Sequence, residues 1–579
     1  MNDVQMKGLR RYMGAVGVLT FALLLGAVAV AGDSAPQTTV ARAIPGVTGD
    51  DDPYPWLEEK DGVRALAWVK EQNARTLDVL KSDPHYDALY QEALQVNESP
   101  DRIAYPQYLR GEIYNFWQDA THVRGIWRQT TLESYRSSSP QWTIVLDLDK
   151  LAADEHRNWV WEGADCAEPA ERVCLLRLSE GGEDAATLRE FDLATGAFVA
   201  TGFRLPRGKQ DVAWDGPNAL LVSREWTPGL LTASGYPYVV KRLRRGQPLS
   251  AAVEVYRGRR EDQLGTLPVT LSDGDGNRAV VIRRGPTFFT TQLFLLTPQG
   301  AKELALPPKA DVAGMVKGQV LVTLTQAWAN GSASFPTGSL IALPLRRTLA
   351  SPLHLSPTLA YAPGRGEAIA IRANDAGVDT TKGSVIVSIY RNVNGRELVL
   401  TPQSGGRWSA RTIALPDNAT TQAVDTSIHS ERVFLSATSF LTPTTLYLAD
   451  ASTGAISAVK TLPALFDASN EIVDQHEVAS TDGTMIPYYV VHSKNMALDG
   501  TNPTVLYAYG GFQLAVTPTY SGELGKLWLE HGGVYAIANI RGGGEFGPEW
   551  HEAGLTVHRQ RIYDDFYAVA SDLIARKIT

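Results

Sequence analysis

The stretch from about residue 100 to 465 sets the strongest constraint on the fold, because it holds short β-rich runs with no convincing long amphipathic helix between them. Gly, Pro, Asn and Asp separate the runs, and these residues favour turns. Such spacing predicts an all-β sandwich, barrel or propeller. Examples of the runs are Trp142–Leu148, Val173–Leu178, Ala219–Ser223, Ala279–Ile282, Val320–Leu324, Ser384–Tyr390 and Val433–Ala437.

A weak internal repeat favours the propeller among these folds. Phe191–Gly196 resembles Leu448–Gly454, and Leu296–Gly300 occupies the same kind of place. Each segment follows a predicted strand and ends in a glycine turn before another strand, as expected for the outer hairpin of a four-stranded blade. At roughly 40–50 residues per blade, the tract has room for seven or eight blades.

Near residue 465 the pattern changes to strands that alternate with helices, which predicts an α/β unit with a parallel sheet. In its last helix, Asp564 and Asp565 would stand in the first turn, where the helix dipole favours negative charge. The expected elements are a hairpin of Ile472–Ser480 and Ile486–His492, strands Thr504–Tyr509 and Val534–Ile540, and helices Leu524–His531 and Tyr563–Arg576.

An amphipathic helix is expected before the β tract, over residues 56–81. Its apolar positions recur at steps of three and four, which predicts one buried face. The preceding segment, Asp52–Pro55, holds the chain extended, because each proline disfavours helix before it. The residues of the predicted buried face are Leu66, Val69, Asn73, Leu77 and Leu80.

The first 31 residues have the pattern of an export signal. Lys7, Arg10 and Arg11 precede an uncharged, mostly apolar run, Met13–Ala31, which ends in a small-x-small cleavage pattern. An uncleaved membrane anchor is the alternative, because the run is nearly long enough to span a bilayer. We therefore expect an exported protein, periplasmic or secreted, with a signal peptide at 1–31 and a polar tether at 32–50. Any membrane contact would be through an uncleaved signal.

Cys166 and Cys174 are the two cysteines of the chain. After export they could pair across the turn-like stretch between them, and two unpaired thiols are the alternative. We favour a structural disulfide. Two cysteines alone make no zinc site, so the sequence predicts no metal.

Two classes of ligand are disfavoured. The net charge of −9 and the lack of a dense basic run argue against nucleic acid. The segment Asn539–Gly547 matches the dinucleotide pattern Gly-x-Gly-x-x-Gly, and Asp565 follows 18 positions after Gly547. Pro548 follows the last glycine, however, and Asp565 would open a helix instead of ending a strand. A glycine-rich loop that shapes the rim of a pocket is the favoured interpretation, and no cofactor is expected.

A nucleophile is missing from the usual patterns. No serine has glycine both two positions before it and two positions after it, as the strand-to-helix elbow of an α/β-hydrolase requires. The ten histidines show no His-Glu-x-x-His spacing, and neither cysteine lies in a catalytic signature.

Two groups of motifs, near opposite ends of the chain, resemble the prolyl oligopeptidase family. The resemblance implies a seven-bladed β-propeller over 100–465 that caps an α/β-hydrolase domain, with the helical segment 51–99 packing on the hydrolase side. The matching residues are Asp52–Glu58, Trp68-Val69 and Gln72-Asn73 in one group, and Tyr507–Phe512, the Gly542 loop, Trp550-His551 and Asp564-Asp565-Phe566 in the other.

The same resemblance implies a Ser-Asp-His peptidase that acts on short peptides, often after proline, in a cavity from which the propeller excludes folded proteins. Tyr509 would help to stabilise the oxyanion, and Phe512 would line the pocket for the residue before the cut. Ordinary packing at a strand end is the alternative for both side chains.

The nucleophile is where the sequence departs from the family. Its elbow would follow the last predicted helix, roughly 10–15 residues beyond Thr579. We therefore expect residues 466–579 to be a partial hydrolase domain that lacks the triad, and the chain to be inactive. Three hypotheses stay open: a truncated family peptidase, an exported propeller that binds peptides, or a truncated esterase-like hydrolase. The sequence predicts no oligomeric state.

Overall fold

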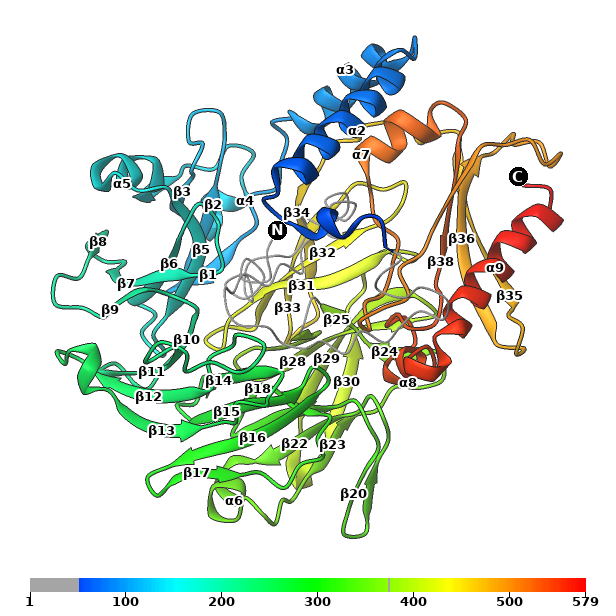
Figure 1. Ribbon diagram of the computed structural model, residues 1–579. Coiled ribbons are helices and arrows are strands. Elements are labelled where there is room, and N and C mark those ends of the chain that lie inside the picture. The colour runs from blue at the N-terminus through cyan, green and yellow to red at the C-terminus, as the bar shows by residue number, and fades with distance from the viewer. Residues whose placement is uncertain (1–51, 373–374) are drawn as a thin grey trace.

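The computed structural model describes residues 52–372 and 375–579 (Figure 1). Seven antiparallel sheets follow one another along the first part of these residues and form the blades of a β-propeller. The prediction of a propeller with seven blades is therefore confirmed. The predicted signal peptide and tether lie outside the described residues.

The first four blades come from residues 107–303. Blade 1 has β1 (Gln107–Leu109), β2 (Glu112–Trp117), β3 (Ile126–Thr131) and β4 (Thr143–Asp147), and blade 2 has β5 (Trp159–Cys166), β6 (Val173–Glu180), β7 (Ala186–Asp192), β8 (Ala197–Phe198) and β9 (Arg204–Gly208). Blade 3 has β10 (Gln210–Trp214), β11 (Ala219–Arg224), β12 (Val239–Arg244) and β13 (Val253–Arg257), and blade 4 has β14 (Leu264–Ser272), β15 (Arg278–Thr287), β16 (Thr290–Thr297) and β17 (Gly300–Glu303).

The last three blades come from residues 310–461. Blade 5 has β18 (Ala310–Val316), β19 (Gln319–Leu324), β22 (Leu340–Pro344) and β23 (Thr358–Tyr361). Blade 6 has β24 (Glu367–Ile369), β27 (Val378–Thr380), β28 (Val385–Arg391), β29 (Asn394–Pro402) and β30 (Trp408–Thr412), and blade 7 has β31 (Thr420–Thr426), β32 (Arg432–Thr438), β33 (Thr445–Asp450) and β34 (Ile456–Thr461). Short pairs β20 (Trp328–Asn330) with β21 (Ala333–Phe335) and β25 (Ile371–Arg372) with β26 (Asp375–Ala376), and helices α4 (Leu132–Arg136), α5 (Leu148–Glu155) and α6 (Leu345–Ala350), lie in the connections.

The internal repeat marks the turn between the third and fourth strands of a blade, as predicted. In blade 2 the Asp192 carboxylate accepts the backbone N–H of Ala194, and in blade 7 the Asp450 carboxylate accepts that of Ser452. Both turns close with a glycine at positive φ, where a side chain would be strained. The repeat is thus a hydrogen-bonded Asx turn that ends each of these outer hairpins.

The ring closes between blades 1 and 7 without a shared strand, because each blade is built from one contiguous segment. The Tyr108 backbone N–H donates to Asp425 Oδ2 at 2.7 Å, and the Arg432 guanidinium donates to the Tyr108 hydroxyl at 2.8 Å. Beneath these bonds, Tyr135 of blade 1 meets Phe434 of blade 7 edge to face. Side-chain contacts therefore hold this seam.

A four-stranded sheet beside the propeller forms the hydrolase unit (Figure 1). The parallel pair is β37 (Thr504–Tyr507) with β38 (Val534–Ala538). Helix α9 (Gln560–Ala575) packs on the sheet through Val569 and Leu573. The strand order is β35 (Glu471–Ala479), β36 (Met485–Ser493), β38 and β37, and the helices are α7 (Gly522–Leu524), α8 (Pro548–Glu552) and α9.

Two helix predictions in this unit are wrong in detail. The helix expected over Leu524–His531 is the single turn α7 followed by a π-helical turn, Gly525–Leu529, where the ring of Phe466 packs directly on Gly525. The last helix begins at Gln560, so Asp564 and Asp565 lie beyond its first turn. Asp565 is fully buried, and its carboxylate forms an ion pair with Arg541 instead of interacting with the helix dipole.

The N-terminal segment consists of a 3-10 turn (Pro55–Glu58), α2 (Val63–Lys81) and α3 (Tyr86–Asn97). Helix α3 packs on the hydrolase side, where Val96 contacts Gly522. The predicted buried face of α2 is wrong: Ala65 is the buried residue of this helix, whereas Leu66, Leu77 and Leu80 are about half exposed. The reason is that α2 lies against α3 and not against the sheet. Among the described residues, none of the helices is both long enough and apolar enough to cross a bilayer.

Replacing Asp425 with alanine should weaken the seam of the ring. The change leaves the Tyr108 N–H without its carboxylate acceptor, so we expect the free energy of unfolding to fall by about 1–3 kcal/mol in urea titration. The matched control is Asp417→Ala, which breaks only a pair between exposed Asp417 and Arg396 and should cost less than about 0.5 kcal/mol. Equal effects of the two changes would contradict the role given to Asp425.

Candidate functional site

Two loops lie next to each other because they follow the adjacent parallel strands β37 and β38. The first spans residues 508–519 and the second spans residues 539–547. Ligands of α/β proteins bind in the crevice outside the carboxyl ends of such strands. The predicted residues Tyr509 and Phe512 both stand on the first loop, so the fold brings them to this crevice.

Glycines let the two loops pack backbone against backbone. A Cβ at position 542 would lie 2.4 Å from the Gly510 carbonyl oxygen, and one at position 544 would lie 2.0 Å from that of Gln513. The loop predicted at the rim of a pocket is itself buried and supports the 508–519 loop from beneath. This packing role explains the Gly542–Gly547 pattern without a nucleotide.

An ion pair fixes the base of the second loop. Arg541 donates two hydrogen bonds to the buried Asp565 carboxylate, at 2.6 and 2.9 Å, and a third to Asp482 of the β35–β36 turn at 2.5 Å. The hydrogen bonds to Asp565 raise the pKa of Arg541 further above its usual range, so its charge is permanent. Asp565 is thus committed to Arg541, which removes it from any ribose-binding role.

Tyr509 is half-buried at the start of the first loop. Burial raises the pKa of its phenol above the usual value. A tyrosine hydroxyl is protonated at neutral pH and can donate a hydrogen bond. The next residue, Gly510, takes a φ of 63°, and its position leaves no room for a side chain against Ile540. The loop therefore turns sharply after Tyr509.

Phe512 projects from the same loop toward the propeller. Its ring is 57% exposed and lies 5.6 Å from that of Phe288, at the β15–β16 turn of blade 4. The neighbouring Phe289 ring lies 5.2 Å from the His551 ring. Two domains thus share one aromatic surface, much of it open to solvent.

Phe288 and Phe289 were missed by sequence reasoning. A pair of phenylalanines at the tip of a hairpin, in Pro286–Thr290, was the available signal, because polar residues are usual at such turns. Which turn of the ring meets the hydrolase unit depends on the closed propeller and is not visible in the sequence.

Glu545 lies beneath the first loop and is 1% exposed. Its Oε1 accepts the Val516 N–H at 2.9 Å and the Asn539 amide at 3.3 Å, whereas its Oε2 has no partner among the described residues. Burial raises the pKa of Glu545 to about 7. His551 is also buried, and burial lowers the pKa of its imidazole. Its Nδ1 lies at hydrogen-bond distance, 2.6 Å, from the Gly542 carbonyl oxygen.

Ser521 and Ser480, the two serines nearest the site, have structural partners. Ser521 Oγ accepts the Leu524 N–H as a helix cap, and Ser480 Oγ lies 3.4 Å from the Arg541 guanidinium. Within residues 52–372 and 375–579, no serine hydroxyl is hydrogen-bonded to a histidine ring. The described site therefore brings together Tyr509, Phe512 and the buried Glu545.

Together these features define a class of protein: a β-propeller that caps the carboxyl edge of an α/β-hydrolase sheet. The family model of the prolyl oligopeptidase N-terminal β-propeller domain matches residues 34–461, and that of the prolyl oligopeptidase family matches residues 520–579. The chain belongs to the prolyl oligopeptidase family.

Three similar proteins place the chain more closely. An uncharacterised peptidase of Sinorhizobium fredii is 46% identical over 558 residues, which are 94% of this chain and 76% of that protein. The solved structure of a post-proline cleaving enzyme from Rickettsia typhi is 28% identical, with a TM-score of 0.81 over 90% of this chain and 77% of that chain. The prolyl endopeptidase of Elizabethkingia meningoseptica is 34% identical over 163 residues, which are 28% of this chain and 23% of that protein.

Replacing Glu545 with glutamine should change how stability depends on pH. A carboxyl whose folded pKa is raised favours the fold below its unfolded pKa, near 4.3, and loses that contribution as pH rises through about 7. We expect the stability of Glu545→Gln relative to the wild type to rise by up to about 3 kcal/mol between pH 4.5 and pH 8.5. Urea titration at several pH values measures this difference, with exposed Glu549→Gln as the control. A difference that does not vary with pH would contradict the assignment.

Proposed function

We propose that this chain carries the substrate-holding part of a serine peptidase that cleaves short peptides after proline. The observation that carries the proposal is the placement of Tyr509 and Phe512 at the carboxyl edge of β37, with Phe512 facing Phe288 of the propeller. An exposed aromatic surface suits the apolar ring of a proline side chain. The similarity to a post-proline cleaving enzyme from Rickettsia typhi supports this choice of substrate.

In the proposed mechanism the Tyr509 hydroxyl donates a hydrogen bond to the oxygen that becomes negative when the peptide carbonyl is attacked. Such a donor accelerates the reaction because its bond strengthens as charge develops in the transition state. Phe512 flanks the proline ring and so places the scissile carbonyl near Tyr509. The propeller covers the site and limits the substrate to peptides short enough to reach it.

We further propose that the nucleophile, acid and base of this reaction are not among the 579 residues. The absence of a Gly-x-Ser-x-Gly elbow from the sequence supports this statement. The structural partners of Ser521 and Ser480 support it as well. The chain alone should then neither turn over a proline peptide nor react with a fluorophosphonate, which labels activated serines.

The role of Tyr509 can be tested in a chimera in which the C-terminal part of the Sinorhizobium fredii peptidase follows residue 579. We expect the chimera to hydrolyse a fluorogenic acyl-proline substrate, and Tyr509→Phe to lower its kcat about 100-fold with little change in KM. The matched control is Tyr507→Phe, at the end of β37 and two residues before Tyr509. Equal kcat values for the two variants would remove Tyr509 from the mechanism.

The preference for proline can be tested on the 579-residue chain itself. We expect a short peptide ending in proline to bind at least about 10-fold more tightly than the same peptide ending in alanine, and Phe512→Ala to abolish this difference. Fluorescence anisotropy of labelled peptides measures both affinities. Equal binding of the two peptides by the wild type would contradict a post-proline specificity. Cleavage of either peptide would contradict the proposal that the nucleophile is not among the 579 residues.

We also propose that the protein is exported. The apolar run after Lys7, Arg10 and Arg11 supports this, and so does the bond between Cys166 and Cys174, since disulfides persist in oxidising compartments. Cell fractionation of the tagged protein would place it outside the cytoplasm, and recovery in the cytoplasm with both thiols reduced would refute the proposal.

A further inference from the structure

The innermost strand of each blade turns into its second strand at the face of the propeller that points away from the hydrolase unit. The innermost strands include β1 and β31, which contact each other across the seam. The hydrolase unit meets the opposite face, where Phe288 stands at a turn between second and third strands. We call the first of these faces the distal face.

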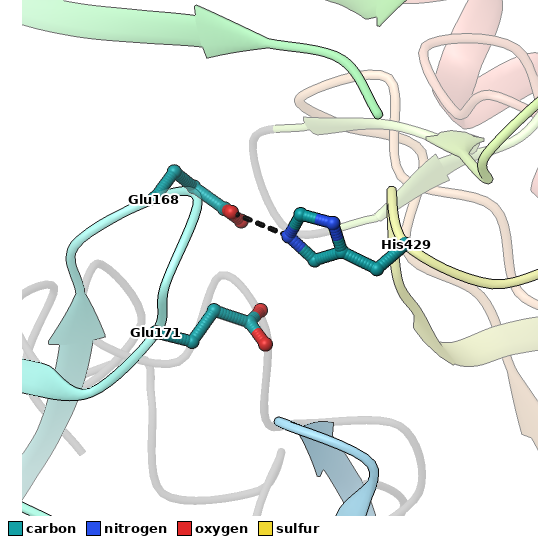
Figure 2. A group of neighbouring side chains, drawn as sticks. All are labelled: Glu168, Glu171 and His429. Carbon is teal, nitrogen blue, oxygen red and sulfur yellow. Dashed lines mark hydrogen bonds and ion pairs between the residues drawn. The ribbon is translucent and has the colours of Figure 1, made fainter. Parts of the chain in front are cut away.

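The β31–β32 loop of blade 7 extends over the distal face. Its residue Ile428 brings a carbonyl oxygen to within 2.1 Å of where a Cβ of Gly274, in blade 4, would lie. Its Ser430 carbonyl accepts the Lys382 N–H of blade 6 at 3.1 Å. Next to these residues, His429 reaches blade 2, and its Nε2 lies 2.8 Å from Glu168 Oε2 (Figure 2).

Three side chains with metal-ligating atoms meet at this point. Glu168, Glu171 and His429 each offer one ligand atom, and these atoms all lie within 4.8 Å of one another. Glu171 is 5% exposed, and both glutamates stand on the β5–β6 loop. Figure 2 shows the two carboxylates and the imidazole directed into the same space.

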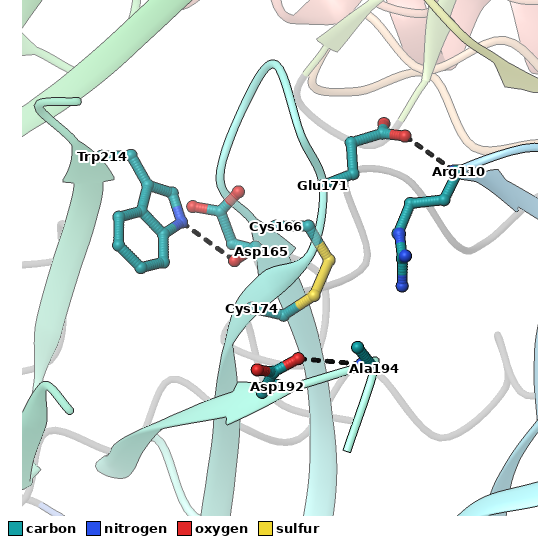
Figure 3. The surroundings of a disulfide bond; sticks show 8 residues. All are labelled: Arg110, Asp165, Cys166, Glu171, Cys174, Asp192, Ala194 and Trp214. Carbon is teal, nitrogen blue, oxygen red and sulfur yellow. Dashed lines mark hydrogen bonds between the residues drawn. A yellow bond between two sulfur atoms is a disulfide. The ribbon is translucent and has the colours of Figure 1, made fainter. Parts of the chain in front are cut away.

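The loop that carries the two glutamates is held in place before any ligand binds. The disulfide between Cys166 and Cys174 closes its base (Figure 3). Inside the loop, the Ala167 N–H donates to the Val173 carbonyl at 2.8 Å. The Arg110 backbone N–H donates to Glu171 Oε2 at 2.9 Å. A carboxylate has room for such a bond and a metal together, because its two oxygens carry about four lone-pair sites.

We propose that Glu168, Glu171 and His429 bind one zinc-class divalent cation on the distal face, which ties blade 2 to blade 7 across the seam of the ring. A set of two carboxylates and one imidazole suits Zn²⁺, which is held by three protein ligands and water at open sites. Ca²⁺ takes six to eight oxygen ligands, and both Ca²⁺ and Mg²⁺ prefer oxygen to imidazole nitrogen, so the histidine favours Zn²⁺. The ion would replace the direct bond between His429 and Glu168.

Small side-chain movements are enough to admit the ion. Two ligands that are each about 2.0–2.2 Å from a tetrahedral Zn²⁺ lie about 3.3 Å apart, so the 2.8 Å contact opens slightly and Glu171 closes in. An adjoining cavity of about 350 Å³, lined in part by Glu171 and His429, leaves space for a bound water. Arg110 and Arg432 also line this cavity, and their charges oppose a cation and lower its affinity.

The consequence for the fold would be a second closure of the ring. The seam between blades 1 and 7 relies on the bonds of Tyr108 with Asp425 and Arg432. A metal held by blades 2 and 7 spans blade 1 and adds a link that bypasses the seam. A metal that binds only the folded ring raises the melting temperature, and the rise grows with the logarithm of metal concentration over Kd.

Zinc titration of the untagged, chelator-treated 579-residue chain tests the proposal. We expect one Zn²⁺ per chain by competition with a chromophoric chelator, and a rise in melting temperature that Ca²⁺ and Mg²⁺ at the same concentration do not produce. His429→Gln and Glu168→Gln should each weaken binding at least about 10-fold. Both substitutions keep the size of the side chain, and a cooperative melt without metal verifies that each variant is folded.

The matched control is His122→Gln. His122 Nδ1 also lies 3.0 Å from a carboxylate, that of Asp119, but no second acidic residue joins that pair in the metal-ligating groups of the described residues. We expect this variant to bind zinc like the wild type. The proposal would be overturned if the wild type failed to bind one equivalent of zinc. It would also be overturned if the His429 and Glu168 variants bound zinc as tightly as the wild type.

Discussion

A side chain at position 542 would collide with the carbonyl oxygen of Gly510, and the geometry of the site depends on that contact. Because both positions are glycine, the loops after β37 and β38 pack backbone to backbone. Arg541, held by the buried Asp565, fixes the lower loop to α9. The upper loop, packed on it, has Tyr509 near its start and turns Phe512 toward the propeller. The placement of Tyr509 and Phe512 rests on this stacking of the two loops.

Much of the fold was predictable because local chemistry repeats. The turns at Asp192 and Asp450 use the same hydrogen bond from the carboxylate to the backbone, so the blade repeat was readable in the residues. The face of α2 was not predictable from periodicity. Leu66 and Leu77 follow a helical period but are about half exposed. The period shows which face a helix can bury, and it does not show which element packs against that face. The same limit applies to Asp565, whose partner Arg541 is 24 residues away and outweighs the helix dipole.

Candidate site residues could be selected from the sequence only where they are close together along the chain. Tyr509 and Phe512 lie within one motif, and a resemblance sufficed to select them. Phe288 meets Phe512 because the propeller closes, and no local pattern reports that contact. Glu168 and His429 are separated by 261 positions, and their meeting depends on a loop of blade 7 that extends to blade 2. Contacts of this kind follow from topology, which sequence spacing does not record.

The central claim is that the propeller and the hydrolase loops form one substrate surface, and a double-mutant cycle between Phe288 and Phe512 tests it most directly. Stability would be measured by urea titration for Phe288→Ala, Phe512→Ala, the double variant and the wild type. Aromatic pairs in contact are coupled by about 0.5–1.5 kcal/mol. The sum of the losses in unfolding free energy of the two single variants should therefore exceed the loss of the double variant by that amount. Strict additivity would show that the two rings do not touch and would contradict a shared surface.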